Sequence, residues 1–278
     1  MQRLPEYLKR PIIDTDKTKK VRHILRDMSL NTVCENARCP NKNECYMHNT
    51  ATFLIMGKVC TRNCLYCNIG CEKPEPLDGN EPKNIALAIK ELGLKYAVLT
   101  SPTRDDLKDG GAGHFKKCIE EIRFINPDCK IEILTPDFKG DKSALNIILE
   151  ASPDVFNHNI EAVKRIFKDV RPQGDYERSI QVLKYMKDNG LKTKSGLIIG
   201  LGENYDDIKD TLADLHSVGC DILTIGQYIQ PSKKHYEIKK IYTPEEYENL
   251  KQMAKDAGIR NYHIGPLVRS SYRAGSIL

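Results

Sequence analysis

From about residue 51 onward, short apolar runs rich in β-branched residues alternate with longer segments of helical periodicity. Each run is five to seven residues long and is bounded by polar or turn-forming residues, a pattern that indicates buried β-strands. We therefore predict six strands: TFLIM (52–56), YAVLTS (96–101), KIEILT (130–135), DVFNHN (154–159), KSGLIIG (194–200) and DILTIGQ (221–227).

In the segments between and after these strands, apolar residues recur with helical spacing, as in IQVLKYM and IKDTLADL. Several segments end at a glycine, which favours helix termination. The last one opens with Thr243 and Glu246 in the spacing of a capping box. The predicted helices cover residues 84–94, 114–125, 143–151, 161–170, 175–190, 205–219 and 243–258.

Repeated strand–helix units predict parallel strands joined by right-handed crossovers, which places the chain in the α/β class. Six units are too few for a complete eight-fold barrel, so a partial parallel barrel and an open sheet are the two alternatives. Both folds bind ligands at the carboxyl ends of their strands. We expect a core formed by residues 51–258, with residues 1–50 and 259–278 as N- and C-terminal extensions.

Composition narrows the class of protein. The 278 residues are 40% hydrophobic, which is enough for a large core. The sequence contains no run of eighteen apolar residues, so we expect no transmembrane helix. Its N-terminus is polar and interrupted by proline, and it lacks the apolar core of a secretory signal. The net charge of +5 is too small to indicate nucleic-acid binding, although it suits an acidic protein partner. We expect a cytoplasmic protein that binds neither membrane nor nucleic acid.

Seven of the ten cysteines lie between Cys34 and Cys71. A disulfide framework is typical of small secreted chains, whereas clustered thiols in a reducing compartment more often bind metal. In VCTRNCLYCNIGC, which follows the first strand, Cys60, Cys64 and Cys67 have the spacing C-x3-C-x2-C. Three such thiolates can hold three corners of an iron–sulfur cubane and leave one iron open. The alternative is a zinc or ferredoxin-like site closed by Cys71.

A second triad lies upstream in CENARCPNKNEC. Cys34, Cys39 and Cys45 have the spacing C-x4-C-x5-C, which suggests a second iron–sulfur centre. Thiolates combined with imidazole also suit zinc, so a zinc site completed by His48 or Cys71 is an open alternative.

These residues carry a family resemblance. The C-x3-C-x2-C spacing, with Tyr66 just before the last cysteine, resembles the radical S-adenosylmethionine superfamily. Over nearly the whole chain the sequence resembles the lipoyl synthase family, and it does so in CENARCPNKNEC, TRDDLKDGGAGHF, PDVFNHNIEAVKRI, VRPQGDY, KSGLIIGLGE, LTIGQYIQPSKKH and GPLVRSSYRAG. The resemblance implies a partial parallel (βα)6 barrel of the radical SAM type with N- and C-terminal extensions.

The resemblance also implies a chemistry. Cys60, Cys64 and Cys67 would hold a catalytic [4Fe–4S] cluster that binds S-adenosylmethionine and cleaves it to a 5′-deoxyadenosyl radical. Cys34, Cys39 and Cys45 would hold an auxiliary [4Fe–4S] cluster, with a serine of the Arg-Ser-Ser-Tyr motif as its fourth ligand. Of the two serines we favour Ser270 over Ser271. The auxiliary cluster would donate two sulfur atoms to C6 and C8 of an octanoyl chain that is carried on a lysine.

We predict that six residues at strand ends and in loops contact S-adenosylmethionine: Tyr66, Gly110, Gly111, Asn157, Lys194 and Glu203. Each also has a structural alternative: a glycine turn, a core aromatic, a polar group at a sheet edge, or an acidic residue at a helix entry. The implied partners are an octanoylated lipoyl carrier protein or domain, an electron donor such as ferredoxin or flavodoxin, and an iron–sulfur carrier that rebuilds the spent cluster. Two rival classes are another radical enzyme with a second cluster and a zinc-binding interaction module.

Overall fold

The computed structural model describes residues 3–11, 15–48 and 50–276, which form an α/β fold with a mostly parallel sheet. The chain divides into two compact units. The N-terminal unit consists of Arg10–Arg62 and Ile69–Val155. The C-terminal unit consists of Met1–Lys9, Asn63–Asn68 and Phe156–Leu278.

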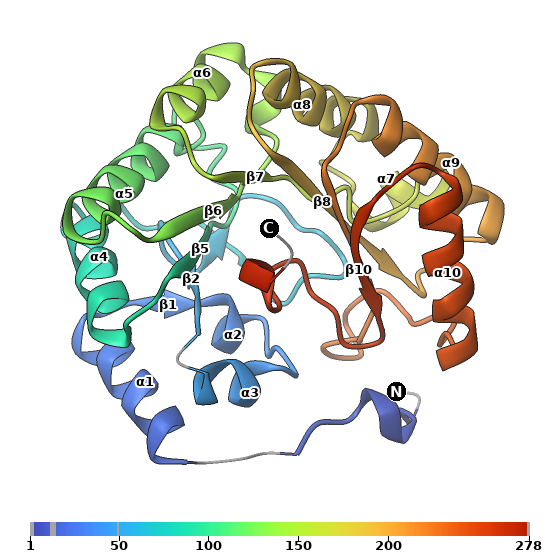
Figure 1. The fold of residues 1–278 in the computed structure, drawn as a ribbon, viewed down its shortest axis with the longest axis horizontal. Helices are drawn as coiled ribbons and strands as arrows, with labels where there is room; N and C mark the ends of the chain where they lie inside the picture. Colours follow the sequence, from blue (N-terminus) through green and yellow to red (C-terminus); the bar gives the residue numbers. More distant parts are fainter. Residues whose placement is uncertain (1–2, 12–14, 49, 277–278) are drawn as a thin grey trace. The chain divides into compact units, whose positions relative to one another are not determined.

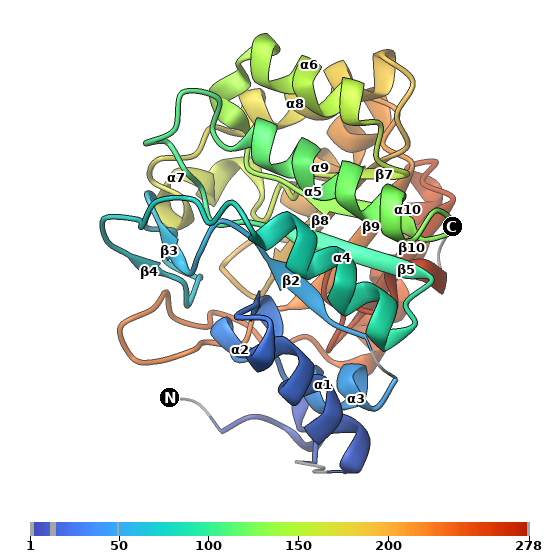
Figure 2. The same cartoon turned by 90° about the vertical axis from the view of Figure 1, so that its left-hand side faces the viewer.

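In the N-terminal unit, parallel strands β2, β5 and β6 are joined by helices, and β1 pairs antiparallel with β2. Helices α4, α5 and α6 cover the outer face of these strands (Figure 1). A separate short ladder of β3 and β4 follows the end of β2 (Figure 2). The elements are α1 (Asp16–Asp27), β1 (Asn31–Thr32), α2 (Val33–Asn36), α3 (Lys42–Met47), β2 (Thr52–Leu54), β3 (Val59–Cys60), β4 (Gly70–Cys71), α4 (Glu81–Leu92), β5 (Tyr96–Thr100), α5 (Ala112–Ile125), β6 (Lys130–Leu134) and α6 (Lys142–Ala151).

The C-terminal unit repeats the arrangement: β8, β9 and β10 are parallel neighbours, and β7 pairs with β8. Helices α8, α9 and α10 lie on the outer side of these strands (Figure 1). The elements are β7 (Val155–Asn157), α7 (Phe167–Val170), α8 (Tyr176–Asp188), β8 (Thr193–Ile199), α9 (Tyr205–Ser217), β9 (Ile222–Gln227), α10 (Pro244–Asp256) and β10 (Asn261–Gly265). Short 3-10 helices cover Glu6–Leu8, Phe138–Gly140, Lys164–Ile166 and Ala274–Ser276 across the two units.

The six predicted strands are all present, and the α/β fold class is confirmed. The capping box that opens α10 is also confirmed, because the Thr243 hydroxyl accepts a hydrogen bond from the Glu246 N–H and Glu246 accepts one from the Thr243 N–H. Within the residues described, no helix is long and apolar enough to cross a membrane.

The helix predicted over residues 161–170 is wrong at its start. Helical structure begins only at Lys164, because Glu161 instead extends the pairing with β8. The Glu161 N–H donates to the Gly196 carbonyl at 2.9 Å, and the Glu161 carbonyl accepts from Ile198 N–H at 2.8 Å. Helix α1 and the parallel strand β10 were not predicted, and neither were the shorter elements β1, α2, α3, β3 and β4.

Candidate active site

The approach to the cysteine loop is fixed by two buried charged residues of the N-terminal unit. Just beyond β2, Met56 adopts a left-handed backbone with φ 64°. Its N–H donates to the Glu81 carboxylate at 2.8 Å, and its carbonyl accepts from the Arg104 guanidinium at 3.1 Å. His114 Nε2 also bonds to Glu81, at 2.7 Å. The backbone at Met56, just before the cysteine loop, is therefore held through both its N–H and its carbonyl group.

Cys60 is the first cysteine of the loop, and its sulfur accepts hydrogen bonds from the protein backbone. Sγ of Cys60 accepts hydrogen bonds from the N–H groups of Arg62 and Thr103, each at 3.3 Å. Thr61 ties the same two segments together, because its N–H and its hydroxyl both donate to the Thr103 carbonyl. Hydrogen bonds to a ligating sulfur help to set the reduction potential of an iron–sulfur cluster.

Arg62 is an internal brace of this loop. Its guanidinium donates to the Asp105 carboxylate at 2.7 and 2.9 Å and forms an ion pair with Asp137 at 2.8 Å. Burial alone would lower the pKa of Arg62, but the bonds to these two carboxylates outweigh it and raise the pKa. The side chains of Arg62 and Asp137 are only 5% and 1% exposed, so the pair is sequestered from water.

Cys71 lies next to Cys60 in the β3–β4 ladder, where the two residues are register partners. Cys71 is exposed, whereas Cys60 is partly covered (Figure 2 shows the ladder). The structure thus separates the two thiols by their access to solvent.

In the C-terminal unit, the segment that carries Cys64 and Cys67 is held from both sides by main-chain bonds. The Leu65 N–H donates to the Val170 carbonyl at 2.9 Å, and the Leu65 carbonyl accepts from Tyr236 N–H at 2.8 Å. His235 Nε2 lies 3.1 Å from the Cys67 carbonyl oxygen, which accepts a hydrogen bond from it. The loop after β9 therefore supports the cysteine segment directly.

Tyr66 is joined to an acidic residue that the sequence analysis did not select. Its hydroxyl donates a hydrogen bond to the Glu161 carboxyl group. Burial raises the pKa of Glu161, while Arg171 and the hydrogen bond from Asn159 act in the opposite direction. Burial also raises the pKa of Tyr66, and the negative charge of Glu161 adds to that shift. Tyr66 therefore keeps its proton and acts as a donor.

Ser270 belongs to the same polar cluster. Its Oγ accepts a hydrogen bond of 3.1 Å from Nδ2 of Asn159, and the same Nδ2 donates to Glu161 at 3.0 Å. The chain of bonds Tyr66–Glu161–Asn159–Ser270 therefore connects the segment of Cys64 and Cys67 to the C-terminal Arg-Ser-Ser-Tyr motif.

Asn157 and Lys194, both predicted to contact the cofactor, are brought together by the sheet. They are register partners of β7 and β8, and both are completely buried. A fully buried lysine requires polar neighbours. Two polar residues at one level of adjacent strands form part of the polar interior of this unit.

Glu203 is engaged within its own turn. Its carboxylate accepts from the N–H groups of Gly200 at 2.5 Å and Leu201 at 2.9 Å, and from the Tyr242 hydroxyl at 2.9 Å. The residue is 7% exposed. A contact to a ribose hydroxyl would have to displace or share one of these bonds.

The glycines of the loop after β5 have a packing reason to be glycine. Gly110 and Gly111 have φ of 61° and 92°, and a side chain at Gly111 would overlap the sulfur of Met56. A β-carbon at Gly110 would meet the Phe138 ring at 3.0 Å.

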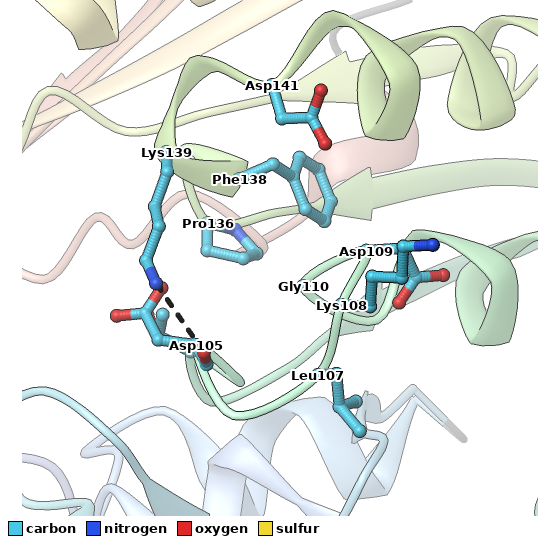
Figure 3. Close-up of a pocket in the computed structure, with 10 residues that line it drawn as sticks. Asp105, Leu107, Lys108, Asp109, Gly110, Pro136, Phe138, Lys139 and Asp141 are labelled. Carbon is cyan, nitrogen blue, oxygen red and sulfur yellow. Dashed lines mark hydrogen bonds and ion pairs between the residues drawn. The ribbon is translucent and has the colours of Figure 1, made fainter.

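Gly110 also lines a pocket of about 130 Å³ (Figure 3). That volume is well below the roughly 300 Å³ of a typical small-molecule site, so this pocket does not enclose a whole cofactor. The pocket is lined by Thr103, Asp105, Leu107, Lys108, Asp109, Gly110, Pro136, Phe138, Lys139 and Asp141.

The upstream cysteines lie on and between two short helices of the N-terminal unit. Cys34 is in α2, Cys45 is in α3, and Cys39 lies between them with its N–H bonded to the Cys34 carbonyl at 3.2 Å. Cys34 is buried, and burial together with the neighbouring charge of Cys39 raises the pKa of its thiol to about 12. A buried thiol beside a second thiol needs nearby positive charge to ionise, and iron would supply it. The donor set therefore fits an iron–sulfur cluster.

Among the residues described, no three His, Cys, Asp or Glu side chains converge on one point as the ligands of a single metal ion would. Cluster ligands bind different irons and stand farther apart than the ligands of one ion.

Comparisons with known proteins place this arrangement in a family. A model of the Radical SAM superfamily matches residues 54–215, and a model of the N-terminal domain of lipoyl synthase matches residues 1–39. The chain is 50% identical to the lipoyl synthase of Caldicellulosiruptor saccharolyticus, over 97% of this chain and 95% of that protein. It is 48% identical to the lipoyl synthase of Leptospira interrogans, over 97% and 91% of the two chains. The chain belongs to the lipoyl synthase family.

Solved structures agree at the level of the fold. Methylornithine synthase (PylB) matches with a TM-score of 0.60 at 13% identity, over 88% of this chain and 74% of that one. HydG, a maturase of the [FeFe]-hydrogenase, matches with a TM-score of 0.59 at 14% identity, over 90% and 56% of the two chains. At these identities the likeness shows a shared fold and no more.

Membership in the lipoyl synthase family makes the chain a sulfur-inserting radical SAM enzyme. The cofactors of such an enzyme are S-adenosylmethionine and [4Fe–4S] clusters. The zinc-binding interaction module is thereby excluded as the class of this protein.

Three residues that organise this lipoyl synthase site were missed as site residues by the sequence analysis: Asn159, Glu161 and Arg62. A signal for two of them was present, because Asn159 is at the polar end of the predicted fourth strand and Glu161 lies two positions farther on. Arg62 gave no signal, since its partners lie 43 and 75 positions away.

Proposed function

We propose that this chain inserts two sulfur atoms at C6 and C8 of an N6-octanoyl-lysine carried by a lipoyl carrier protein or domain. The observation that carries the proposal is a second triad of thiols, Cys34, Cys39 and Cys45, in a chain that matches lipoyl synthases over 97% of its length. A radical enzyme needs three cysteines for its own cluster, and a second set provides for a second cluster that can serve as a sulfur source.

In this proposal the three cysteines of the C-x3-C-x2-C loop ligate the catalytic [4Fe–4S] cluster and leave one iron for S-adenosylmethionine. When bound, that pair supplies a 5′-deoxyadenosyl radical able to take hydrogen from an unactivated C–H bond. The protein contributes positioning. The amides of Arg62 and Thr103 hold the Cys60 sulfur, and the bonds to Leu65 and Cys67 hold the rest of the loop.

The auxiliary cluster is proposed on Cys34, Cys39 and Cys45, with Ser270 as its oxygen ligand. A hard serine oxygen binds one iron of a soft cluster less durably than a thiolate does, which suits a cluster that is consumed. Ser270 is supported as the ligand by the hydrogen bond from Asn159, which orients its hydroxyl.

Contacts to S-adenosylmethionine are proposed for Tyr66, Gly110, Gly111, Asn157, Lys194 and Glu203. Asn157 and Lys194 have the strongest support because the β7–β8 register places them together in the buried interior. Glu203 and the two glycines have the weakest, since each already has a structural role in its own loop. We further propose a cytoplasmic location, an electron donor of the ferredoxin or flavodoxin type, and an iron–sulfur carrier that rebuilds the spent cluster.

The test is anaerobic reconstitution followed by assay with an octanoyl-lysine carrier domain. We expect about eight irons per chain, as two four-iron clusters require. 5′-Deoxyadenosine should form, and the mass of the carrier should increase by two sulfur atoms, with loss of two hydrogens once the dithiol product is oxidised to its cyclic disulfide. Ser270→Ala should still form 5′-deoxyadenosine but fail to complete the product, whereas Ser271→Ala serves as the matched control. A wild-type yield of lipoyl product from Ser270→Ala would show that Ser270 is not the ligand.

A further inference from the structure

The side-chain amide of Asn159 makes two directed contacts. Asn159 lies two positions after the end of β7 and is 8% exposed. Its Nδ2 donates to Oγ of Ser270 at 3.1 Å and to Oε1 of Glu161 at 3.0 Å. Each contact takes one N–H, so both protons of the amide are used. Its Oδ1 is buried without a hydrogen-bond partner in the described part of the chain.

Glu161 determines which end of the amide faces Ser270. Oε1 of Glu161 accepts its hydrogen bond from Nδ2 at 3.0 Å, so the NH₂ end of Asn159 points toward the carboxyl group. A flipped amide would bring Oδ1 against the carboxylate oxygen and lose both bonds. Tyr66 donates to Glu161 as well, which fixes the carboxyl group independently of Asn159.

The backbone around Asn159 is built to hold this arrangement. Glu161 has a φ of 67°, an unfavourable conformation for a residue with a side chain, and two main-chain bonds to β8 maintain it. Gly196 of β8 leaves room for the amide, because a β-carbon there would lie 2.7 Å from Oδ1 of Asn159. Backbone strain of this kind is concentrated at functional sites.

We infer that Asn159 is a positioning residue for Ser270, and that Glu161 sets the orientation of its amide. The inference rests on the proposed role of Ser270 as a ligand of the auxiliary cluster. An N–H donor directed at the serine oxygen stabilises negative charge on it and fixes the direction of its remaining lone pairs. Asn159 therefore determines how firmly the serine holds its iron, and so how readily the cluster is opened.

The experiment isolates the auxiliary cluster in the full-length chain by replacing Cys60, Cys64 and Cys67 with alanine. After anaerobic reconstitution, the rate of iron release to a chelator and the Mössbauer spectrum report on that cluster without any turnover. Asn159→Ala should release the serine-bound iron about fivefold faster, the effect expected from losing a hydrogen bond of roughly 1 kcal/mol.

Asn159→Leu keeps the branched shape of the side chain and removes its N–H donors without adding a charge beside Glu161, so it should behave like Asn159→Ala. This second variant remains informative if the alanine variant folds poorly. Asn189→Ala is the matched control, because Asn189 is exposed and its side-chain amide donates to the Tyr185 carbonyl within its own helix end. It should leave the release rate unchanged.

A double variant distinguishes the role of Asn159 from the ligand assignment of Ser270. If Asn159 acts through Ser270, Asn159→Ala should add nothing to the release rate of Ser270→Ala. Additive effects, or an unchanged rate in both Asn159 variants while Ser270→Ala is fast, would overturn the role of Asn159. An unchanged rate in Ser270→Ala would instead refute the ligand assignment in the proposed function.

Discussion

Sγ of Cys60 accepts a hydrogen bond from the backbone N–H of Thr103 at 3.3 Å. The two residues follow β2 and β5, which are parallel neighbours, so the ends of two strands converge on the first cysteine of the loop. A backbone donor cannot be lost by substitution of a side chain. The placement of this sulfur is therefore set by the backbone that follows two neighbouring strands, and it does not depend on a side chain of Thr103.

Cys71 is expected to be dispensable. It is exposed and lies beside Cys60 in the β3–β4 ladder, and a fourth thiolate ligand would occupy the iron needed for S-adenosylmethionine. Cys71→Ser should keep 5′-deoxyadenosine formation within about twofold of wild type, as is usual for an exposed substitution. Cys67→Ser should abolish it. Loss of radical formation in Cys71→Ser would mean that the loop uses four thiols.

Arg62 is expected to dominate the stability of the loop. Arg62→Met would leave Asp137, whose side chain is 1% exposed, without its ion-pair partner. Removing one partner of a buried pair costs about 3–5 kcal/mol in the free energy of unfolding. Lys139→Met is the control. Lys139 is 59% exposed and its ion pair with Asp105 is long, at 3.7 Å, so this substitution should cost less than about 1 kcal/mol. Urea denaturation of the metal-free protein measures the loss of unfolding free energy in each variant. Similar denaturation midpoints for Arg62→Met and Lys139→Met would contradict the bracing role of Arg62.

Much of this fold could be predicted because the buried strands are short, apolar runs between clear helices. The pattern failed where tertiary contacts override it. Glu161 lies in a helical-looking sequence, yet β8 captures its backbone. Strand β10 is polar and partly exposed along its first residues, so its pairing with β9 left no alternation to detect.

In the site, too, local patterns could be predicted and long-range contacts could not. Cysteine spacing is local, and both triads could be proposed from the sequence alone. The contact between Asn159 and Ser270 joins positions 111 residues apart, and no local pattern records it. Gly111 was selected as part of a cofactor loop, but its packing against Met56 supplies a structural reason that only the folded chain reveals.

Glu246 is expected to make stability depend on pH in the acid range. Burial raises the pKa of Glu246, but bonds from Lys240, the Thr243 N–H and Tyr205 outweigh it and lower the pKa from 4.5 to about 2. A carboxylate with a lowered folded-state pKa contributes stability above pH 4.5, and that contribution disappears as the pH falls toward 2. The difference in melting temperature between wild type and Glu246→Gln should therefore shrink over this interval. Glu248→Gln is the control, because it removes an exposed ion pair with Lys251, and its difference in melting temperature from wild type should change little with pH. If the difference for Glu246→Gln is also constant with pH, Glu246 does not make stability depend on pH.

The C-terminal segment is expected to depend on a glycine of β9. A β-carbon at Gly226 would overlap the Val268 carbonyl, so the chain approaching Ser270 lies directly against the backbone of that strand. Gly226→Ala should displace this segment while the sheet still forms, because the parallel partners of β9 are retained. Hydrogen exchange measured by mass spectrometry should increase over residues 266–276. Gly79→Ala is the matched control, since a β-carbon added there would have no neighbour within 4 Å and the backbone of Gly79 is not left-handed. If exchange in the C-terminal segment is the same in both variants, the contact with Gly226 does not hold Ser270 in place.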